Sequence, residues 1–273
     1  MNTISLVTGG AGFIGSNLVD YLLEKGHSVI CLDNESANNE KFYWPLENGR
    51  AISIKADVTD YKAMKNVFTN VDYVFHLAAE SRLQSAIQNP IQAVEKNCVG
   101  TTVMLQCARE AGVKRFIYSS TSSGYGNNPY PNVETQPDDC LNPYSASKVA
   151  GEKFCKMYRD LYGLETVVFR YFNVFGNRSP ARGQYAPVIG IFQRQKEAGE
   201  PLTIVGDGSQ RRDFVHVSDI ARANYLACTM PLDGYNGEVL NVGTGSAYSV
   251  QQIADAISDN QTYIPKRLSL IHI

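Results

Sequence analysis

The chain has 273 residues, of which 44% are hydrophobic and 19% are charged, a composition typical of a globular protein with a sizeable core. Its 25 basic and 27 acidic side chains leave a net charge of -2, which argues against a basic surface for nucleic acid. No apolar run reaches the roughly 18 residues that cross a membrane, so we expect no membrane partner. The six cysteines contain no Cys-x-x-Cys pair, and we expect reduced thiols and a cytoplasmic protein.

Strands and helices alternate through the first two thirds of the chain. Short apolar segments predict strands at 3–8, 27–32, 51–56, 72–77, 114–119 and 166–170. Helical spacing predicts helices at 13–25, 91–111 and 142–161, each followed by a glycine of the kind that ends helices: Gly26, Gly112 and Gly163. This alternation is typical of right-handed βαβ crossovers, so we predict an α/β fold with a Rossmann-type, doubly wound parallel sheet.

The sequence changes character after Tyr171. A loop is predicted at 173–187, a helix at 188–198, extended segments at 202–205 and 213–217, and a further helix that Ser218 and Asp219 cap. A strand near 238–242 is expected to return to the main sheet. We therefore divide the chain into a main domain, 1–172 with this return strand, and a small C-terminal lobe that takes up most of 173–273.

A glycine-rich turn, Thr8-Gly-Gly-Ala-Gly-Phe-Ile-Gly15, joins the first predicted strand to the first helix. In a dinucleotide-binding turn, glycines such as Gly9, Gly12 and Gly15 permit the bend, the approach of a pyrophosphate and close packing of helix on strand. The helix then points the amide groups of Phe13 and Ile14 at the phosphates. The alternative, a glycine-rich connection without a ligand, is disfavoured by the strand-turn-helix context.

Asp33, at the end of the second predicted strand, indicates which dinucleotide binds. Its carboxylate can accept hydrogen bonds from both ribose hydroxyls and would repel a 2′-phosphate. Residues 34–40 contain no Lys or Arg to offset that repulsion, so NAD is favoured over NADP. Asp57, after the third strand, is either an acceptor for the adenine amino group or the cap of a turn, and the sequence leaves both open.

Tyr144 and Lys148 lie four residues apart, so both project from one face of the helix predicted at 142–161. An unperturbed tyrosine has a pKa near 10, and acting as a base at neutral pH requires help worth about 4 kcal/mol. Lys148 and an oxidised nicotinamide would each supply a positive charge. Thr121, or its neighbours Ser119 and Ser120, would share the proton at the carboxyl edge of the sheet. The alternative is an exposed helix pair without a catalytic role.

Together these motifs resemble the extended short-chain dehydrogenase/reductases, in the branch of NAD-dependent nucleotide-sugar epimerases and dehydratases. The resemblance runs from Ile4 to about Arg267. Besides the glycine turn and Asp33, it is carried by five segments: His76-Leu-Ala-Ala79, Tyr118-Ser-Ser-Thr-Ser-Ser-Gly-Tyr-Gly126, Pro143-Tyr-Ser-Ala-Ser-Lys148, Arg170-Tyr-Phe-Asn-Val-Phe-Gly176 and Arg211-Arg-Asp-Phe-Val-His-Val217.

The segment after the fifth predicted strand, Thr121-Ser122-Ser123, indicates the reaction within this branch. Dehydratases typically carry Thr-Asp-Glu there and decarboxylases Thr-Ser-Glu, so the absence of both acids favours an epimerase. The resemblance then implies epimerisation of a UDP-sugar at C4 through a transient 4-keto sugar, with UDP-glucose and UDP-galactose or their N-acetyl forms as substrates. Two alternatives stay open: a decarboxylase, dehydratase or reductase of the same branch, and an NAD-binding protein without catalysis.

The resemblance also implies a role for individual residues. Catalysis falls to Thr121, Tyr144 and Lys148, and no metal is expected. The cofactor contacts are Gly9, Gly12, Phe13, Ile14, Gly15, Asp33, Asn34, Asp57, Val58, Leu77, Ala78, Ala79, Asn97, Ser119, Tyr144, Lys148, Tyr171 and Val174. The substrate contacts are Glu80, Ser81, Thr121, Asn173, Ala186, Val188, Thr203, Val205, Arg212 and Arg267. Arg212 would hold the diphosphate, and its alternative is an ion pair with Asp213.

Two further expectations come from the resemblance. Family members often form homodimers in which two long helices of each subunit make a four-helix bundle, here the helices at about 91–111 and 143–161. They also usually continue well beyond the segment that corresponds to Pro265-Lys-Arg267, so we expect a shortened C-terminus. The missing stretch usually carries a nucleotide contact and a gate for sugar size.

Overall fold

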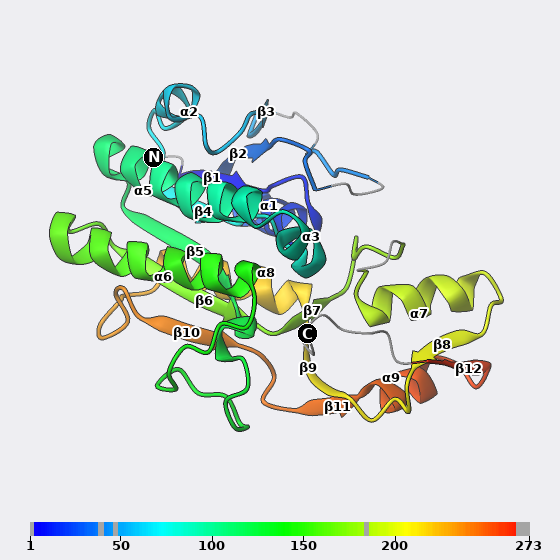
Figure 1. Cartoon of the computed structure of the whole chain (residues 1–273). Coiled ribbons are helices and arrows are strands. Elements are labelled where there is room, and N and C mark those ends of the chain that lie inside the picture. Colours follow the sequence, from blue (N-terminus) through cyan, green and yellow to red (C-terminus); the bar gives the residue numbers. More distant parts are fainter. Residues whose placement is uncertain (1–2, 38–40, 46–48, 183–185, 266–273) are drawn as a thin grey trace.

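The computed structural model of the protein describes residues 3–37, 41–45, 49–182 and 186–265. Seven strands of this described chain form a parallel sheet: β1 (Ile4–Thr8), β2 (Ser28–Asp33), β3 (Ala51–Lys55), β4 (Tyr73–His76), β5 (Arg115–Thr121), β6 (Thr166–Tyr171) and β10 (Val239–Val242). Their order across the sheet is β10-β6-β5-β4-β1-β2-β3 (Figure 1). The chain reverses direction across the sheet between β1 and β4, so the predicted doubly wound α/β fold is confirmed.

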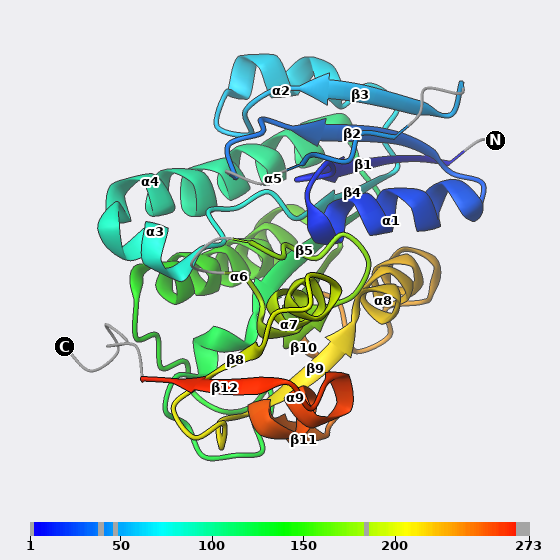
Figure 2. The same ribbon diagram turned by 90° about the vertical axis from the view of Figure 1, so that its right-hand side faces the viewer.

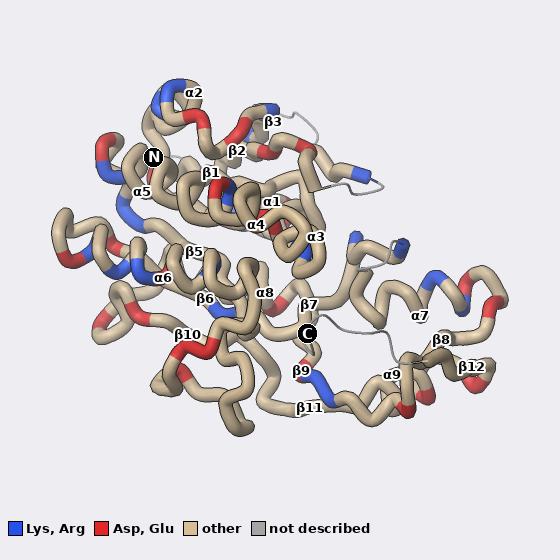
Figure 3. Tube along the Cα trace, in the orientation of Figure 1, with Lys and Arg blue, Asp and Glu red and all other residues tan. Residues whose placement is uncertain are grey.

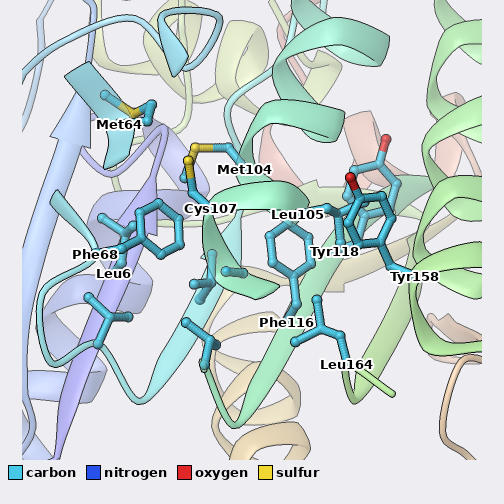
Figure 4. Packing of buried hydrophobic residues seen from close by; sticks show 14 of the residues in the cluster. Leu6, Met64, Phe68, Met104, Leu105, Cys107, Phe116, Tyr118, Tyr158 and Leu164 are labelled. Carbon is cyan, nitrogen blue, oxygen red and sulfur yellow. The ribbon is translucent and has the colours of Figure 1, made fainter. Parts of the chain in front are cut away.

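Helices cover both faces of this sheet (Figures 1 and 2). One face packs against α2 (Tyr61–Val67), α5 (Gly100–Ala111) and α6 (Pro143–Tyr162), and the other against α1 (Phe13–Glu24) and α8 (Val217–Thr229). The first face buries a continuous apolar cluster that includes Met104, Phe116 and Tyr118 (Figure 4). Strands β5 and β6 are buried along their whole length, as expected for strands that are covered on both faces.

The helix predicted at 91–111 is present but is not regular. A five-residue π-helical turn, η1 (Glu95–Val99), separates α4 (Pro90–Val94) from α5, and a short helix, α3 (Leu83–Gln88), precedes it. A π turn changes the direction of the side chains that it carries. Asn97, in the middle of this turn, is completely buried and reaches the start of α6. None of the described helices combines the length and apolar character that a bilayer crossing needs.

A small lobe lies beside the main sheet (Figure 1). It contains β7 (Asn173–Phe175), α7 (Val188–Glu197), β8 (Leu202–Val205), β9 (Arg211–His216), β11 (Ala247–Ser249), α9 (Val250–Ile257) and β12 (Gln261–Ile264). These strands form two small sheets, β11-β9-β7 and β12-β8. The buried part of its apolar core consists of Phe192, Leu202, Ile204 and Ala254. The predicted return strand is confirmed as β10, which pairs in parallel with β6.

The predicted cap of α8 is wrong. The helix begins at Val217, so Ser218 and Asp219 lie inside its first turn. The capping residue is His216, whose Nδ1 accepts a hydrogen bond from the Ser218 amide at 3.3 Å and lies 2.7 Å from Ser218 Oγ. An imidazole nitrogen here takes the place that a Ser, Thr, Asp or Asn oxygen usually fills, which the preference for those residues did not reveal.

Candidate active site

One large cavity, of about 1540 Å³, lies at the carboxyl edge of the main sheet and extends to the small lobe. Open α/β sheets bind their ligands at this edge, next to the point where the strand order reverses. Most of the predicted site residues, although distant in the sequence, line this one cavity: Gly9, Gly12, Phe13, Ile14, Gly15, Asp33, Asn34, Asp57, Val58, Leu77, Ala78, Ala79, Ser81, Ser119, Thr121, Tyr144, Lys148, Tyr171, Asn173, Ala186 and Arg212.

Six other predicted contacts do not line it: Glu80, Asn97, Val174, Val188, Thr203 and Val205. Val174 and Val188 instead line a second cavity of about 230 Å³, which shares Asn173, Pro187 and Arg212 with the large one. Thr203 and Val205 lie on β8 and line neither of these cavities. The predicted contact at Arg267 lies outside the described residues.

The glycine turn has the shape that a pyrophosphate site needs. A Cβ atom on Gly15 would lie 2.1 Å from the Gly9 carbonyl oxygen, so the helix and turn pack as closely as predicted. A Cβ atom on Gly12 would meet the Gly9 oxygen at 3.3 Å and otherwise open space, because this side of the turn faces the cavity. Helix α1 begins at Phe13 without a side-chain cap, which leaves its first amide groups for a ligand.

Asp33 ends β2 with its side chain at the edge of the cavity. It is 8% exposed, and its carboxylate accepts hydrogen bonds from the amides of Ala11 at 3.2 Å and Glu35 at 2.8 Å. Burial raises the pKa of this carboxyl group, and the backbone hydrogen bonds oppose the rise. A carboxylate has about four acceptor positions, so capacity remains for the two hydroxyls of a ribose.

Two lysines from other elements approach the loop after Asp33, and the sequence analysis missed both. Lys96 Nζ donates a hydrogen bond to Ser36 Oγ at 2.9 Å, and Lys55 forms an ion pair with Glu35. Lys96 also lines the cavity. The preference for NAD over NADP therefore depends on repulsion by Asp33 and not on an absence of nearby cations.

Asp57 caps the turn that follows β3. Its Oδ1 accepts hydrogen bonds from the amide of Thr59 at 2.9 Å and from its hydroxyl at 2.7 Å. Its Oδ2 accepts one from Asn34 Nδ2 at 2.7 Å. The hydrogen bonds thus match the turn-cap alternative, while the position of Asp57 on the cavity wall keeps the adenine contact as a prediction.

Tyr144 lies in the first turn of α6 and lines the cavity. Asn142 caps the helix by accepting a hydrogen bond from the Ser145 amide at 2.9 Å, and Pro143 occupies the first turn. Burial raises the pKa of the Tyr144 hydroxyl, and a hydrogen bond with Thr121 opposes the rise. The structure therefore brings together the tyrosine of α6 and the threonine at the end of β5, as predicted.

Lys148 is a buried cation one helical turn beyond Tyr144. It is 2% exposed, its ammonium group lies 4.2 Å from the centre of the Tyr118 ring, and no described carboxylate lies at ion-pair distance. Burial lowers the pKa of Lys148 to about 8, because the charged form loses hydration. The group stays mainly protonated at neutral pH, so the positive charge that a tyrosine base needs is available there.

Polar side chains behind the cavity hold its wall. Asn97 accepts a hydrogen bond from the Glu80 amide at 2.7 Å and donates to the Glu80 carbonyl at 3.1 Å and to Ser147 Oγ at 2.9 Å. These bonds join the loop after β4 to α6. The predicted role of Asn97 as a cofactor contact is thus replaced, for its side chain, by one of support.

Tyr171 and Ser119 form a second buried contact of this kind. The Tyr171 hydroxyl lies 2.9 Å from Ser119 Oγ and accepts a hydrogen bond from Asn224 Nδ2 at 2.7 Å. Burial raises the pKa of Tyr171 to about 12, so this phenol stays neutral. Because the Ser119 hydroxyl is engaged by Tyr171, Thr121 is the better placed of the two to share a proton with Tyr144.

Arg212 contributes a positive charge from the small lobe. Figure 3 shows basic residues at the start of β9, where Arg211 and Arg212 stand. The Asp213 carboxylate is instead occupied by the amides of Thr244 and Gly245, at 2.9 and 2.8 Å. The alternative of an Arg212–Asp213 ion pair is therefore not realised among the described residues, and Arg212 lines both cavities.

Comparison with known proteins identifies the family. The sequence matches the NAD dependent epimerase/dehydratase family over residues 5–243. The chain belongs to this family. Its members include a UDP-glucose 4-epimerase of Mycolicibacterium smegmatis, which is 37% identical over 97% of this chain and 86% of that protein. The family is NAD dependent, and a solved relative shares the fold described above.

The similar proteins do not all carry out the same reaction. A UDP-N-acetyl-alpha-D-glucosaminuronate decarboxylase of Bacillus cytotoxicus is 36% identical over 92% of this chain and 78% of its own length. The solved UDP-N-acetylglucosamine 4-epimerase of Methanobrevibacter ruminantium, in complex with UDP-N-acetylmuramic acid, is 33% identical with a TM-score of 0.91, covering 98% of this chain and 86% of that one. The names of both relatives contain a UDP-sugar, but one is a decarboxylase and the other a 4-epimerase.

Proposed function

We propose that the chain epimerises a UDP-sugar at C4, interconverting UDP-glucose and UDP-galactose or their N-acetyl forms. The observation that carries this proposal is the set of groups at the reacting end of the cavity: Thr121, Tyr144 and Lys148, followed by the hydroxyls of Ser122 and Ser123. An elimination or decarboxylation in this branch would use an additional acid at the position of Ser123. Among the side chains, a C4 epimerisation needs only a base that can take and return one proton, because the hydride would go to and come from bound NAD.

The roles of the three catalytic residues follow from their environment. Tyr144 accepts the proton of the sugar 4-hydroxyl, and Thr121, on the same cavity wall, orients that hydroxyl. Lys148 supplies the buried positive charge that stabilises the tyrosinate. Bound NAD, which the glycine turn and Asp33 would hold, would supply the acceptor and donor for the hydride of C4. Between the two hydride transfers the 4-keto sugar must turn so that it presents its other face.

Residues of the small lobe support this turning. Arg212 and Asn173 stand where the diphosphate would be held, and a guanidinium group is well suited to bind it in a bidentate manner. If the diphosphate is the firmly held part, the sugar is free to rotate about its link to the phosphate. The large cavity, about 1540 Å³, leaves room for that rotation beside the cofactor.

Product analysis tests the proposal. Purified protein, with no NAD added, is incubated with UDP-glucose or UDP-N-acetylglucosamine, and the sugar nucleotides are separated by chromatography. The expected product is the 4-epimer, with bound NAD unchanged in amount. A stable 4-keto product, or release of carbon dioxide in a parallel incubation with a UDP-uronate, would replace the proposal by a dehydratase or decarboxylase. NAD that remains bound without any turnover would indicate a non-catalytic NAD-binding protein.

We also propose a cytoplasmic homodimer that buries α4, α5 and α6. Large apolar side chains are exposed along α4, η1 and α6: Ile91, Val94, Val99, Met157 and Leu161. Ile91 is 79% exposed and Leu161 66% exposed, which is unusual for neighbouring helices without a partner. Light scattering should give twice the chain mass, and Leu161→Glu should shift the mass toward that of one chain. The matched change Ile52→Glu, at another exposed residue on β3, should leave the mass unchanged.

A further inference from the structure

A buried ion pair joins the catalytic helix α6 to the main sheet. Arg170, on β6, donates hydrogen bonds from Nε to Glu152 Oε1 at 2.9 Å and from Nη2 to Glu152 Oε2 at 2.6 Å. The two side chains are 3% and 1% exposed. A bidentate pair at this depth is directional, and loss of one partner leaves an uncompensated buried charge.

The same carboxylate reaches a second strand. Ser120 Oγ donates a hydrogen bond to Glu152 Oε1 at 2.5 Å. Ser120 immediately precedes Thr121 on β5, and Glu152 follows Lys148 by one helical turn on α6. One carboxylate therefore connects the two elements that carry the predicted catalytic hydroxyl and the buried cation, and Figure 1 shows α6 lying along β5 and β6.

We infer that Glu152 is a positioning residue for catalysis: it fixes α6 against the end of β5 and keeps the Lys148 side chain as a cation one helical turn from Tyr144. The inference rests on the proposed function, because it assigns Lys148 and Tyr144 their roles in proton transfer. Glu152 itself does not line the cavity, so it acts through Ser120, Arg170 and the charge that it places near Lys148.

The charge on Lys148 has several influences. Burial lowers its pKa, while the carboxylate of Glu152 raises it. The other ionisable groups that face Lys148 come from α6, η1, β4 and β5: Cys155, Cys98, His76 and Tyr118. If Glu152 becomes neutral while Arg170 keeps its charge, the surroundings of Lys148 become more positive, so its pKa must fall further.

Asp138 provides a matched control for the loss of a carboxylate. Its Oδ1 accepts a hydrogen bond from the same Arg170 Nη2 at 2.5 Å, and its Oδ2 forms an ion pair with Lys153 at 2.8 Å. Asp138 is not among the groups that influence the pKa of Lys148. The substitution Asp138→Asn therefore removes one acidic partner of Arg170 without changing the charge next to Lys148.

The experiment compares Glu152→Gln with Asp138→Asn in the NAD-containing protein. The NMR signal of the Lys148 ammonium group, in protein labelled with ¹⁵N-lysine, is followed against pH, with Lys148→Arg to assign the signal. Glu152→Gln should lower the midpoint by about one pH unit and move the alkaline limb of kcat/KM by the same amount. Asp138→Asn should leave both midpoints unchanged. A folded Glu152→Gln protein that titrates like the parent, or an equal shift in Asp138→Asn, would overturn the inference.

Glu152→Asp tests position apart from charge, and it serves if Glu152→Gln does not fold. The shorter carboxylate keeps the charge but cannot reach Arg170 and Ser120 together, so kcat should fall about tenfold with little change in KM or in the Lys148 midpoint. A parental kcat would refute the positioning role. If the parent chain shows no epimerase activity, the proposed function fails, whereas the Lys148 titration still decides whether Glu152 controls that charge.

Discussion

The main sheet and the small lobe share one cavity but are built very differently. On the main sheet, β5 and β6 are buried along their whole length, and apolar clusters fill both faces. In the described part of the small lobe, the apolar cluster under α7, α9 and β8 has only four buried side chains, and β8 alternates between buried and half-buried residues. A thinner core opens at lower cost. The comparison teaches that the groups proposed to react and to contact the cofactor stand mostly on the region with the larger core, while many of the proposed substrate contacts stand on the region with the smaller one.

The strongest test of this comparison removes the base from the main sheet. Tyr144→Phe should lower kcat about 10³-fold, because the proton acceptor is lost while the surrounding packing is kept. The NAD content, measured after denaturation, should equal that of the parent, since the glycine turn and Asp33 are untouched. Turnover within tenfold of the parent would show that the base lies elsewhere in the cavity.

A pair of completely buried phenylalanines compares the two cores. Phe116 belongs to the main sheet and Phe192 to the small lobe, and both are 0% exposed. Each change to alanine should cost about 3–5 kcal/mol in the stability of the region around it. Phe116→Ala should lower the melting temperature and the affinity for NAD, whereas Phe192→Ala should weaken UDP-sugar binding and leave NAD binding nearly unchanged. If Phe192→Ala lowered the affinities for NAD and for the UDP-sugar equally, the two regions would not differ in the ligand that they support.

Asp33→Ala tests cofactor choice within the main sheet. The change removes the acceptor of the ribose hydroxyls, so NAD affinity should fall by about 1.5–3 kcal/mol, the usual worth of a hydrogen bond to a charged group. NADP affinity should fall much less or rise, because the repulsion of its 2′-phosphate is also removed. Calorimetric titration with both dinucleotides measures the ratio. An equal loss for the two would show that Lys96 or another group controls the choice.

Acid should destabilise the main sheet through His76. This side chain is 0% exposed and is hydrogen-bonded to the hydroxyls of Thr8 and Thr101. Burial lowers the pKa of His76 to about 3. Neutral His76 stabilises the folded protein fully above about pH 6.5, the pKa of a histidine in the unfolded chain. This stabilisation is lost as pH falls toward 3, because the unfolded chain then binds a proton that the folded protein does not. About 2 kcal/mol should be gone at pH 5.

Urea unfolding at pH 7 and pH 5 measures this loss. His76→Asn should flatten the dependence, with a smaller slope remaining from His27, whose pKa is also lowered by burial. A pH dependence that His76→Asn does not change would assign the acid sensitivity to groups outside the main sheet.

The elements that the sequence predicted are those with strong local signals. The six early strands and the glycines after α5 and α6 were found because apolar runs and glycine at the helix end are local features. The short helices α2 and α3 were missed, because about two turns leave little periodicity to detect. Strands β7, β11 and β12 were missed for the same reason.

The residues of the candidate site also divide into those with a local sequence signal and those without one. Gly12, Asp33, Tyr144 and Lys148 follow spacings that the chemistry itself requires, so the sequence alone could place them together. Contacts between distant residues gave no such signal. The approach of Lys96 to Ser36 and the bridge from Glu152 to Ser120 join positions 60 and 32 residues apart. Only the packing of α4, α5 and α6 on the sheet brings them within reach.

The uncapped start of α1 has a consequence for how this protein can change over evolutionary time. The donors that face the cavity there are main-chain amides of Phe13 and Ile14, which every residue except proline possesses. Mutation can therefore replace both side chains without deleting the anchor for an anion. The glycines beside them lack this freedom, since an added methyl at Gly15 would collide with Gly9. An anion site of this kind tolerates substitution of its side chains as long as the backbone conformation of the turn is preserved.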